Sequence, residues 1–151
     1  MPLSRQRLFS RARRSVPEAR DFAVGTLTLW EIEERVDDLR LGVSELAANA
    51  VAHGVPAGRQ FCVRLARDGD LVRLEVRDSG GGLPLVHPPS GDLCSGRGLW
   101  LARAVADGFG VIPHRVGKTV WLTFEVASAP PRSRAADTPG VAPVSADVPL
   151  A

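Results

Sequence analysis

The sequence has little of what several common classes of protein require. Of its 151 residues two are cysteines, Cys62 and Cys94, too few for a disulfide framework and typical of a reducing compartment. No run approaches the roughly 20 consecutive apolar residues that span a bilayer, and no apolar signal peptide follows Met1. Aromatic residues make up 5% of the chain and tyrosine is absent, so stacking platforms for bases are not expected. These absences favour a cytoplasmic protein that binds neither membranes nor nucleic acid directly.

Length and composition fit one globular domain between two polar segments. A chain with 44% hydrophobic and 24% charged residues is ordinary for a globular protein, and 151 residues are enough to bury a core. The first 14 residues contain five arginines and no acidic residue, which predicts a basic, flexible leader over residues 1–14. Proline, alanine and serine dominate the end of the chain, which predicts a disordered tail over residues 127–151. The folded domain is therefore expected over residues 15–126.

Hydrophobic periodicity predicts an alternation of helices and hairpins. A Ser-x-x-Glu sequence at Ser15 is typical of a helix start, and a second, long helix should end near Gly54. Strict alternation of apolar and polar residues on both sides of Gly69 predicts a hairpin. A third helix is expected from about Leu99, and a second hairpin should turn at Gly117. This order predicts an α+β sandwich, with helices packed on one face of a mixed, mostly antiparallel sheet.

Two polar residues on the second helix form the first candidate element of a binding site. Glu45 and Asn49 lie four positions apart, so they project from one side of the helix. They border the apolar stripe that contains Leu46 and Ala50, at the edge of the expected core. An amide oxygen and a carboxylate one turn apart suit a hard Mg²⁺ ion with its waters and the phosphates that it bridges. Taken alone, the pair is also typical of an ordinary helix surface.

Two glycine clusters follow this helix. Asp78-Ser79-Gly80-Gly81-Gly82 comes directly after a predicted strand; the aspartate can accept a hydrogen bond from an exocyclic amine, and the glycines allow close approach to a flat ring. Gly96-Arg97-Gly98-Leu99 leads into the third helix, whose free N–H groups favour a phosphate. Singly, each cluster is also explained by a flexible turn or an unusual helix start. Their order along the chain predicts a nucleotide site.

The three elements resemble the asparagine box and the two glycine boxes of the GHKL ATPase superfamily. More narrowly, residues 15–126 resemble its bacterial anti-sigma-factor serine/threonine kinase branch. The resemblance implies a Bergerat fold that binds ATP and Mg²⁺. By position, Asn49 would coordinate Mg²⁺, Asp78 would hold the adenine amine, and Glu45 would be the general base that takes a proton from the attacking hydroxyl.

The resemblance also implies the remaining ATP contacts. Gly80 and Gly82 would line the base pocket, and Gly96 and Gly98 would contact phosphates. The expected ATP-binding set is completed by four further residues: Arg97, Leu99, Lys118 and Thr119. Lys118 would either reach a phosphate or be a solvated lysine in a turn.

The function that the resemblance implies is a protein kinase with two protein partners. It would phosphorylate a serine or threonine of an anti-anti-sigma (STAS-type) protein and thereby regulate a sigma factor. The alternative is a non-catalytic module that uses ATP to hold a partner; Glu45 favours the kinase. A homodimer is also suggested, with Phe9, Trp30 or the first helix as its contact surface.

Overall fold

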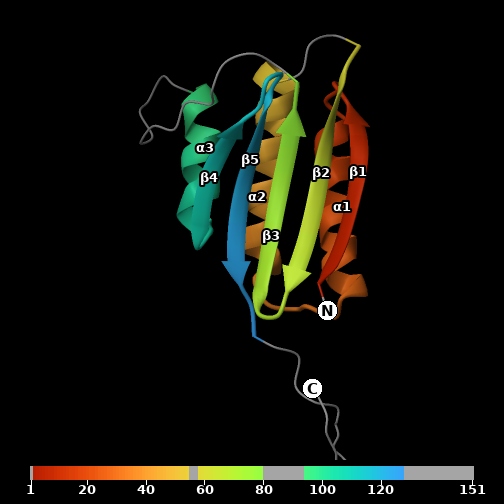
Figure 1. The fold of residues 1–151 in the computed structure, drawn as a ribbon, viewed down its shortest axis with the longest axis vertical. Helices are drawn as coiled ribbons and strands as arrows, with labels where there is room; N and C mark the ends of the chain where they lie inside the picture. The colour runs from red at the N-terminus through yellow and green to blue at the C-terminus, as the bar shows by residue number, and fades with distance from the viewer. Residues whose placement is uncertain (1, 55–57, 80–93, 128–151) are drawn as a thin grey trace, which may run out of the picture.

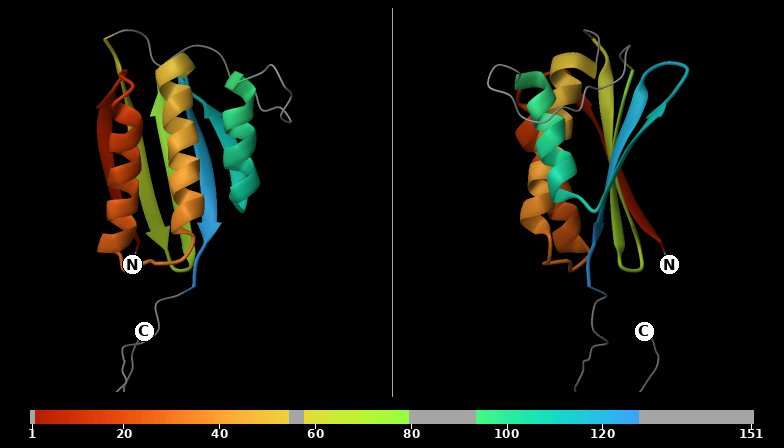
Figure 2. Two further views of the ribbon diagram at one scale, coloured as in Figure 1. Left: turned by 180° about the vertical axis from the view of Figure 1, so that it is seen from behind. Right: turned by 90° about the vertical axis from the view of Figure 1, so that its left-hand side faces the viewer.

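The computed structural model describes residues 2–54, 58–79 and 94–127, and there three α-helices lie on one face of a five-stranded sheet (Figures 1 and 2). The strand order is β1-β2-β3-β5-β4, and every described pairing is antiparallel. The elements, in chain order, are β1 Leu3–Ser10, α1 Ser15–Leu29, α2 Val36–Asn49, the π-helical turn η1 Ala50–Gly54, β2 Gln60–Asp68, β3 Leu71–Asp78, α3 Cys94–Val105, β4 Gly108–Pro113 and β5 Lys118–Glu125. The predicted α+β sandwich is confirmed, with an antiparallel rather than a mixed sheet in the described residues.

The basic N-terminal segment is a strand, so the prediction of a flexible leader is wrong for Leu3–Ser10. This segment, β1, pairs with β2 along its whole length. Phe9 anchors it, because this residue is 3% exposed and its ring centroid lies 5.7 Å from that of Phe61. Arg5 stacks over the ring of Phe22 at 5.1 Å, so the charged residues of this edge strand cover apolar surface. Since Phe9 is buried, it is not the exposed dimer contact that the sequence suggested.

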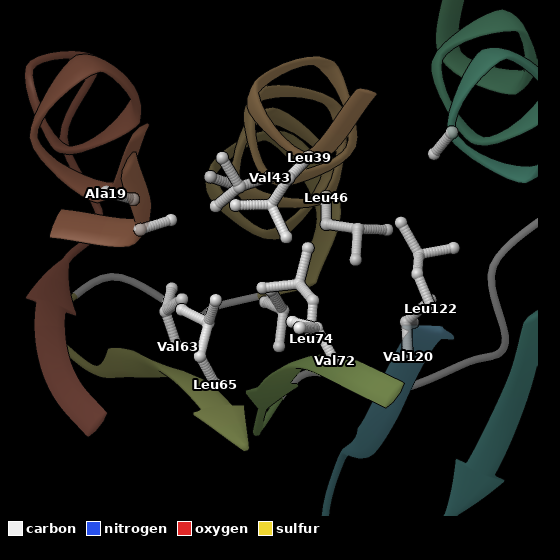
Figure 3. Close-up of a cluster of buried hydrophobic side chains, with 14 of the residues drawn as sticks. Ala19, Leu39, Val43, Leu46, Val63, Leu65, Val72, Leu74, Val120 and Leu122 are labelled. Carbon is white, nitrogen blue, oxygen red and sulfur yellow. The ribbon is translucent and has the colours of Figure 1, made fainter. Parts of the chain in front are cut away.

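The core lies between the sheet and the helices, and it follows the predicted alternation of the strands (Figure 3). Each buried leucine-sized side chain stabilises the fold by about 1.5–3 kcal/mol relative to an exposed one. The largest fully buried side chains are Phe61, Phe124, Leu27, Leu39, Leu46, Leu65, Leu74, Leu99 and Leu122. They come from α1, α2, α3, β2, β3 and β5, so the core joins the helical layer to the three central strands of the sheet.

The central helix α2 packs closely on β3 and β5 because one of its inward positions is a glycine. A Cβ atom at Gly42 would lie 2.8 Å from Leu122 Cδ1 and 3.4 Å from Phe124 Cζ. Figure 3 shows Leu39, Val43 and Leu46 of this helix directed at the sheet. A glycine in a helix interior is unfavourable by about 1 kcal/mol relative to alanine. Close packing at this point therefore accounts for a residue that helix propensity alone would not select.

The third helix begins earlier than the sequence suggested. Because α3 starts at Cys94, Gly96 lies in its first turn and Gly98 in its second, rather than in a loop before it. The predicted tail, apart from Ala127, lies outside the described residues. Within the described part of the chain, no helix is long and apolar enough to cross a membrane.

Candidate nucleotide-binding site

One end of the molecule gathers the elements that the sequence singled out. β3 ends there at Asp78, and β5 begins beside it at Lys118. At the same end α2 passes into η1 at Asn49, and α3 begins (Figures 1 and 2). The helix pair α2 and α3 and the ends of two adjacent strands therefore frame a common region.

A buried ion pair joins β3 to β5 at this end. Lys118 Nζ lies 2.8 Å from Asp78 Oδ2, and each of the two side chains is 3% exposed. The two residues are direct partners in the strand register. Asp78 continues the alternating buried row of β3, as Lys118 does that of β5, so both side chains lie on the face that the helices cover. The expectation of a solvated turn lysine is therefore wrong.

The turn between β4 and β5 packs on the end of β3. Gly117 has a φ of +81°, and a Cβ atom there would overlap the carbonyl oxygen of Asp78. Ser79, the residue that follows β3, has a buried Oγ with no hydrogen-bond partner among the described residues. A buried hydroxyl without a partner is destabilising by about 1–3 kcal/mol. The position fits a ligand that brings a polar group, as a nucleotide does.

The two candidate residues of α2 lie half-buried beside the core residue Leu46. Burial raises the pKa of the Glu45 carboxyl, and no described residue forms a hydrogen bond or ion pair with it. Asn49 is the last residue of α2, and the π-helical turn that follows it is a feature often found at functional sites. The described residues include no cluster of three or more His, Cys, Asp or Glu suited to a metal ion.

Comparison with known proteins identifies the family. The family model of the histidine kinase-like ATPase domain matches residues 9–124 of this chain. This chain belongs to that family. Membership implies ATP binding, and the match spans both the α2 residues and the strand ends described above.

A solved structure supports the fold of this histidine kinase-like ATPase domain. The crystal structure of the RsbU and RsbW domains of Rv1364c from Mycobacterium tuberculosis superimposes with a TM-score of 0.63 at 22% sequence identity. The match covers 83% of this chain and 32% of that chain, so it shows a shared fold over about a third of a longer protein. No curated protein matches the sequence.

The histidine kinase-like ATPase domain does not bring all the predicted residues to the Asp78 end of the sheet. Thr119 points to the opposite face of the sheet from Lys118, because successive side chains of a strand alternate. Its Oγ1 lies 2.7 Å from Nε2 of His114 across the turn. The structure therefore does not place Thr119 with Asp78. The sequence did not predict the contact of His114 with Thr119, because the two become neighbours only once the hairpin register is known.

The glycine clusters are described only in part. Gly80 and Gly82 lie outside the described residues. The backbone of α3 is helical through Gly96, Arg97 and Gly98, and the side chain of Arg97 is outside the described part of the chain. Leu99 is 1% exposed and belongs to the core, so it positions α3 rather than offering a polar contact. Ser79 was not a predicted site residue, although its place directly after Asp78 is the signal that could have identified it.

Proposed function

We propose that this domain binds Mg-ATP at the Asp78 end of the sheet and transfers the γ-phosphoryl group to a serine or threonine of a protein partner. The partner would be an anti-anti-sigma protein of the STAS type, and its phosphorylation would control a sigma factor. The family and the fold support an ATP-binding domain. The observation that carries the proposal further, to phosphotransfer, is the half-buried carboxylate of Glu45 next to Asn49.

Glu45 is suited to act as a general base. Burial raises the pKa of its carboxyl, which makes the ionised form a better proton acceptor than an exposed glutamate. Its lack of a partner among the described residues leaves it available to a hydroxyl group from the protein substrate. Phosphoryl transfer depends mainly on positioning and charge stabilisation, so the task of this base is to orient the hydroxyl and accept its proton.

Asn49 and Asp78 would fix the two ends of the nucleotide. The amide oxygen of Asn49, one helical turn from Glu45, would hold Mg²⁺, which when bound neutralises charge on the phosphate oxygens. Asp78 would accept a hydrogen bond from the amine of adenine. Since α2 and β3 share the core, the fold holds these two contacts at the same end of the molecule.

Calorimetry with Mg-ATP and a transfer assay with labelled ATP and candidate anti-anti-sigma proteins test the proposal. Glu45→Gln should keep its ATP affinity and lose about 10²- to 10⁴-fold in transfer rate, the usual contribution of a positioned base. Asn49→Ala should lose Mg-ATP binding, and Glu33→Gln, which changes an exposed glutamate before α2, should alter neither property. In the wild type, transfer should fall at acidic pH as Glu45 is protonated, starting at a higher pH than for an ordinary glutamate.

Each outcome decides between defined alternatives. Tight Mg-ATP binding by Asn49→Ala would refute the metal assignment. Unchanged transfer by Glu45→Gln would remove the base role. ATP binding without transfer to any partner would leave the non-catalytic, ATP-dependent binding module as the function of this domain.

A further inference from the structure

The chain uses lysine at a single position. Lys118 is the only lysine among its 19 lysine and arginine residues, and it stands at the nucleotide end of the sheet. The ammonium of a lysine is compact and carries three donors, whereas a guanidinium is a wide planar fork. A buried position next to a carboxylate on paired strands therefore suits lysine better than the arginine used everywhere else.

The Lys118 ammonium has donors left after it has bound Asp78. Within the described residues Asp78 is its one hydrogen-bond partner, at 2.8 Å, although the side chain is 3% exposed. A desolvated ammonium is stabilised by further acceptors, because unused donors of a buried charge are unfavourable. A ligand that docks at Asp78 and carries an acceptor beside its own donor would satisfy them.

The edge of adenine has this pattern. Its exocyclic N6 amine is a donor, and the neighbouring ring nitrogen N1 is an acceptor separated from the amine by one carbon. If the amine donates to Asp78, N1 would face a group beside that carboxylate, and Lys118 Nζ is such a group. A hydrogen bond from the amine to the carboxylate and one from the ammonium to N1, each of about 2.9 Å, would then engage both members of the ion pair.

We propose that Lys118 is a base-recognition residue, which donates a hydrogen bond to N1 of adenine while Asp78 accepts one from the N6 amine. The inference rests on the proposed binding of ATP at this end. The ion pair then presents an acceptor and a donor in a fixed order. A 6-oxopurine in the same pose reverses that order, because its O6 would face the carboxylate and its N1–H would face the ammonium. Lys118 thereby contributes to the selection of adenine over guanine.

Nucleotide analogues test this in the wild-type protein by calorimetry. 1-deaza-ATP replaces N1 by C–H, and its affinity should be about 10- to 100-fold weaker than that of ATP, the usual effect of losing a hydrogen bond to a charged group. 7-deaza-ATP, which changes the opposite side of the base, should bind within about twofold of ATP if the base edge alone is read. Equal affinities for ATP and 1-deaza-ATP would overturn the role of Lys118 while leaving ATP binding intact. Failure of the wild type to bind ATP at all would overturn both proposals.

A variant and a spectroscopic measurement complete the test. Lys118→Met should lose affinity for ATP and no longer distinguish it from 1-deaza-ATP, whereas Arg115→Met, at an exposed position of the same turn, should behave as the wild type. Tighter ATP binding by Lys118→Met would show that the ammonium competes with the amine and would refute the proposal. Because the variant removes one partner of a buried ion pair, the contact of Lys118 with N1 is also tested in the wild type. ¹⁵N-lysine labelling of the wild type gives one side-chain resonance, that of Lys118. ATP should shift this resonance clearly more than 1-deaza-ATP, and equal shifts would again refute the contact.

Discussion

Removal of the Lys118 ammonium should destabilise the fold far more than removal of the whole ion pair. Both side chains of the Lys118–Asp78 pair are 3% exposed, and their charged atoms lie 2.8 Å apart. Loss of one partner of a buried ion pair is typically destabilising by about 3–5 kcal/mol, whereas apolar replacement of both partners is often neutral or stabilising. Lys118→Met should therefore lower the free energy of unfolding by about 3–5 kcal/mol. The double variant Lys118→Met/Asp78→Leu should recover most of that loss.

Urea denaturation followed by tryptophan fluorescence measures both effects. With a urea m-value of about 2 kcal/mol per molar, the single variant should unfold at a midpoint about 2 M lower than the wild type. The midpoint of the double variant should lie much closer to that of the wild type. Arg77→Met, at the exposed position before Asp78, controls for loss of a positive charge at this end of the sheet. Equal destabilisation in the single and double variants would show that the buried charge is not the cause, and no destabilisation in the single variant would show that the pair is not buried in solution.

Two further predictions concern a turn and a titrating group. Gly117→Ala should destabilise the domain by about 2 kcal/mol or more in thermal denaturation, because φ is +81° and the new Cβ would overlap the carbonyl of Asp78; Gly25→Ala, with open space around it, should not, and a similar loss in both would contradict the reasoning. The pKa of Asp107 is lowered, first by a hydrogen bond from the backbone N–H of Glu125 and then by Arg35. Its stabilising effect is thus present above the ordinary pKa of 3.8 and lost as the pH falls through the lowered pKa. Asp107→Asn should accordingly have a lower melting temperature than the wild type at pH 7, with a difference that shrinks in acid; a difference independent of pH would refute this assignment.

An element is predicted well from the sequence where apolar residues recur at a short, regular spacing. It is predicted poorly where one tertiary contact determines whether the element forms. The hairpin of β2 and β3 follows from strict alternation, because one face must be buried. The sequence does not predict β1 because its arginines resemble a solvated segment, and Phe9 is the one buried hydrophobic residue of this strand. The start of α3 was placed too late because the glycines Gly96 and Gly98 have low helix propensity, which the contacts of the helix with the core outweigh.

The same distinction applies to the candidate site. Glu45 and Asn49 are adjacent on a helix by spacing alone, so the sequence is enough to pair them. Asp78 and Lys118 are 40 residues apart, and their contact depends on β5 returning to lie beside β3 with β4 outside it. That pairing is a property of sheet topology, which local patterns do not specify. A lysine that appears to be an exposed turn residue in the sequence is consequently a buried partner of the predicted base-binding carboxylate.

Different parts of the fold hold the two groups of proposed site residues in place, so the position of one group does not depend on that of the other. The groups proposed for catalysis and metal binding lie on α2, whose approach to the sheet is set by the absence of a side chain at Gly42. The groups proposed for base recognition lie on paired strands, where register fixes their distance regardless of how the helix sits. A small movement of α2 would thus change the geometry of Glu45 and Asn49 toward the phosphates and leave the Asp78–Lys118 pair intact. Substitutions in the strand layer should for this reason change base recognition, whereas substitutions on α2 should change the contacts to the metal, the phosphates and the attacking hydroxyl.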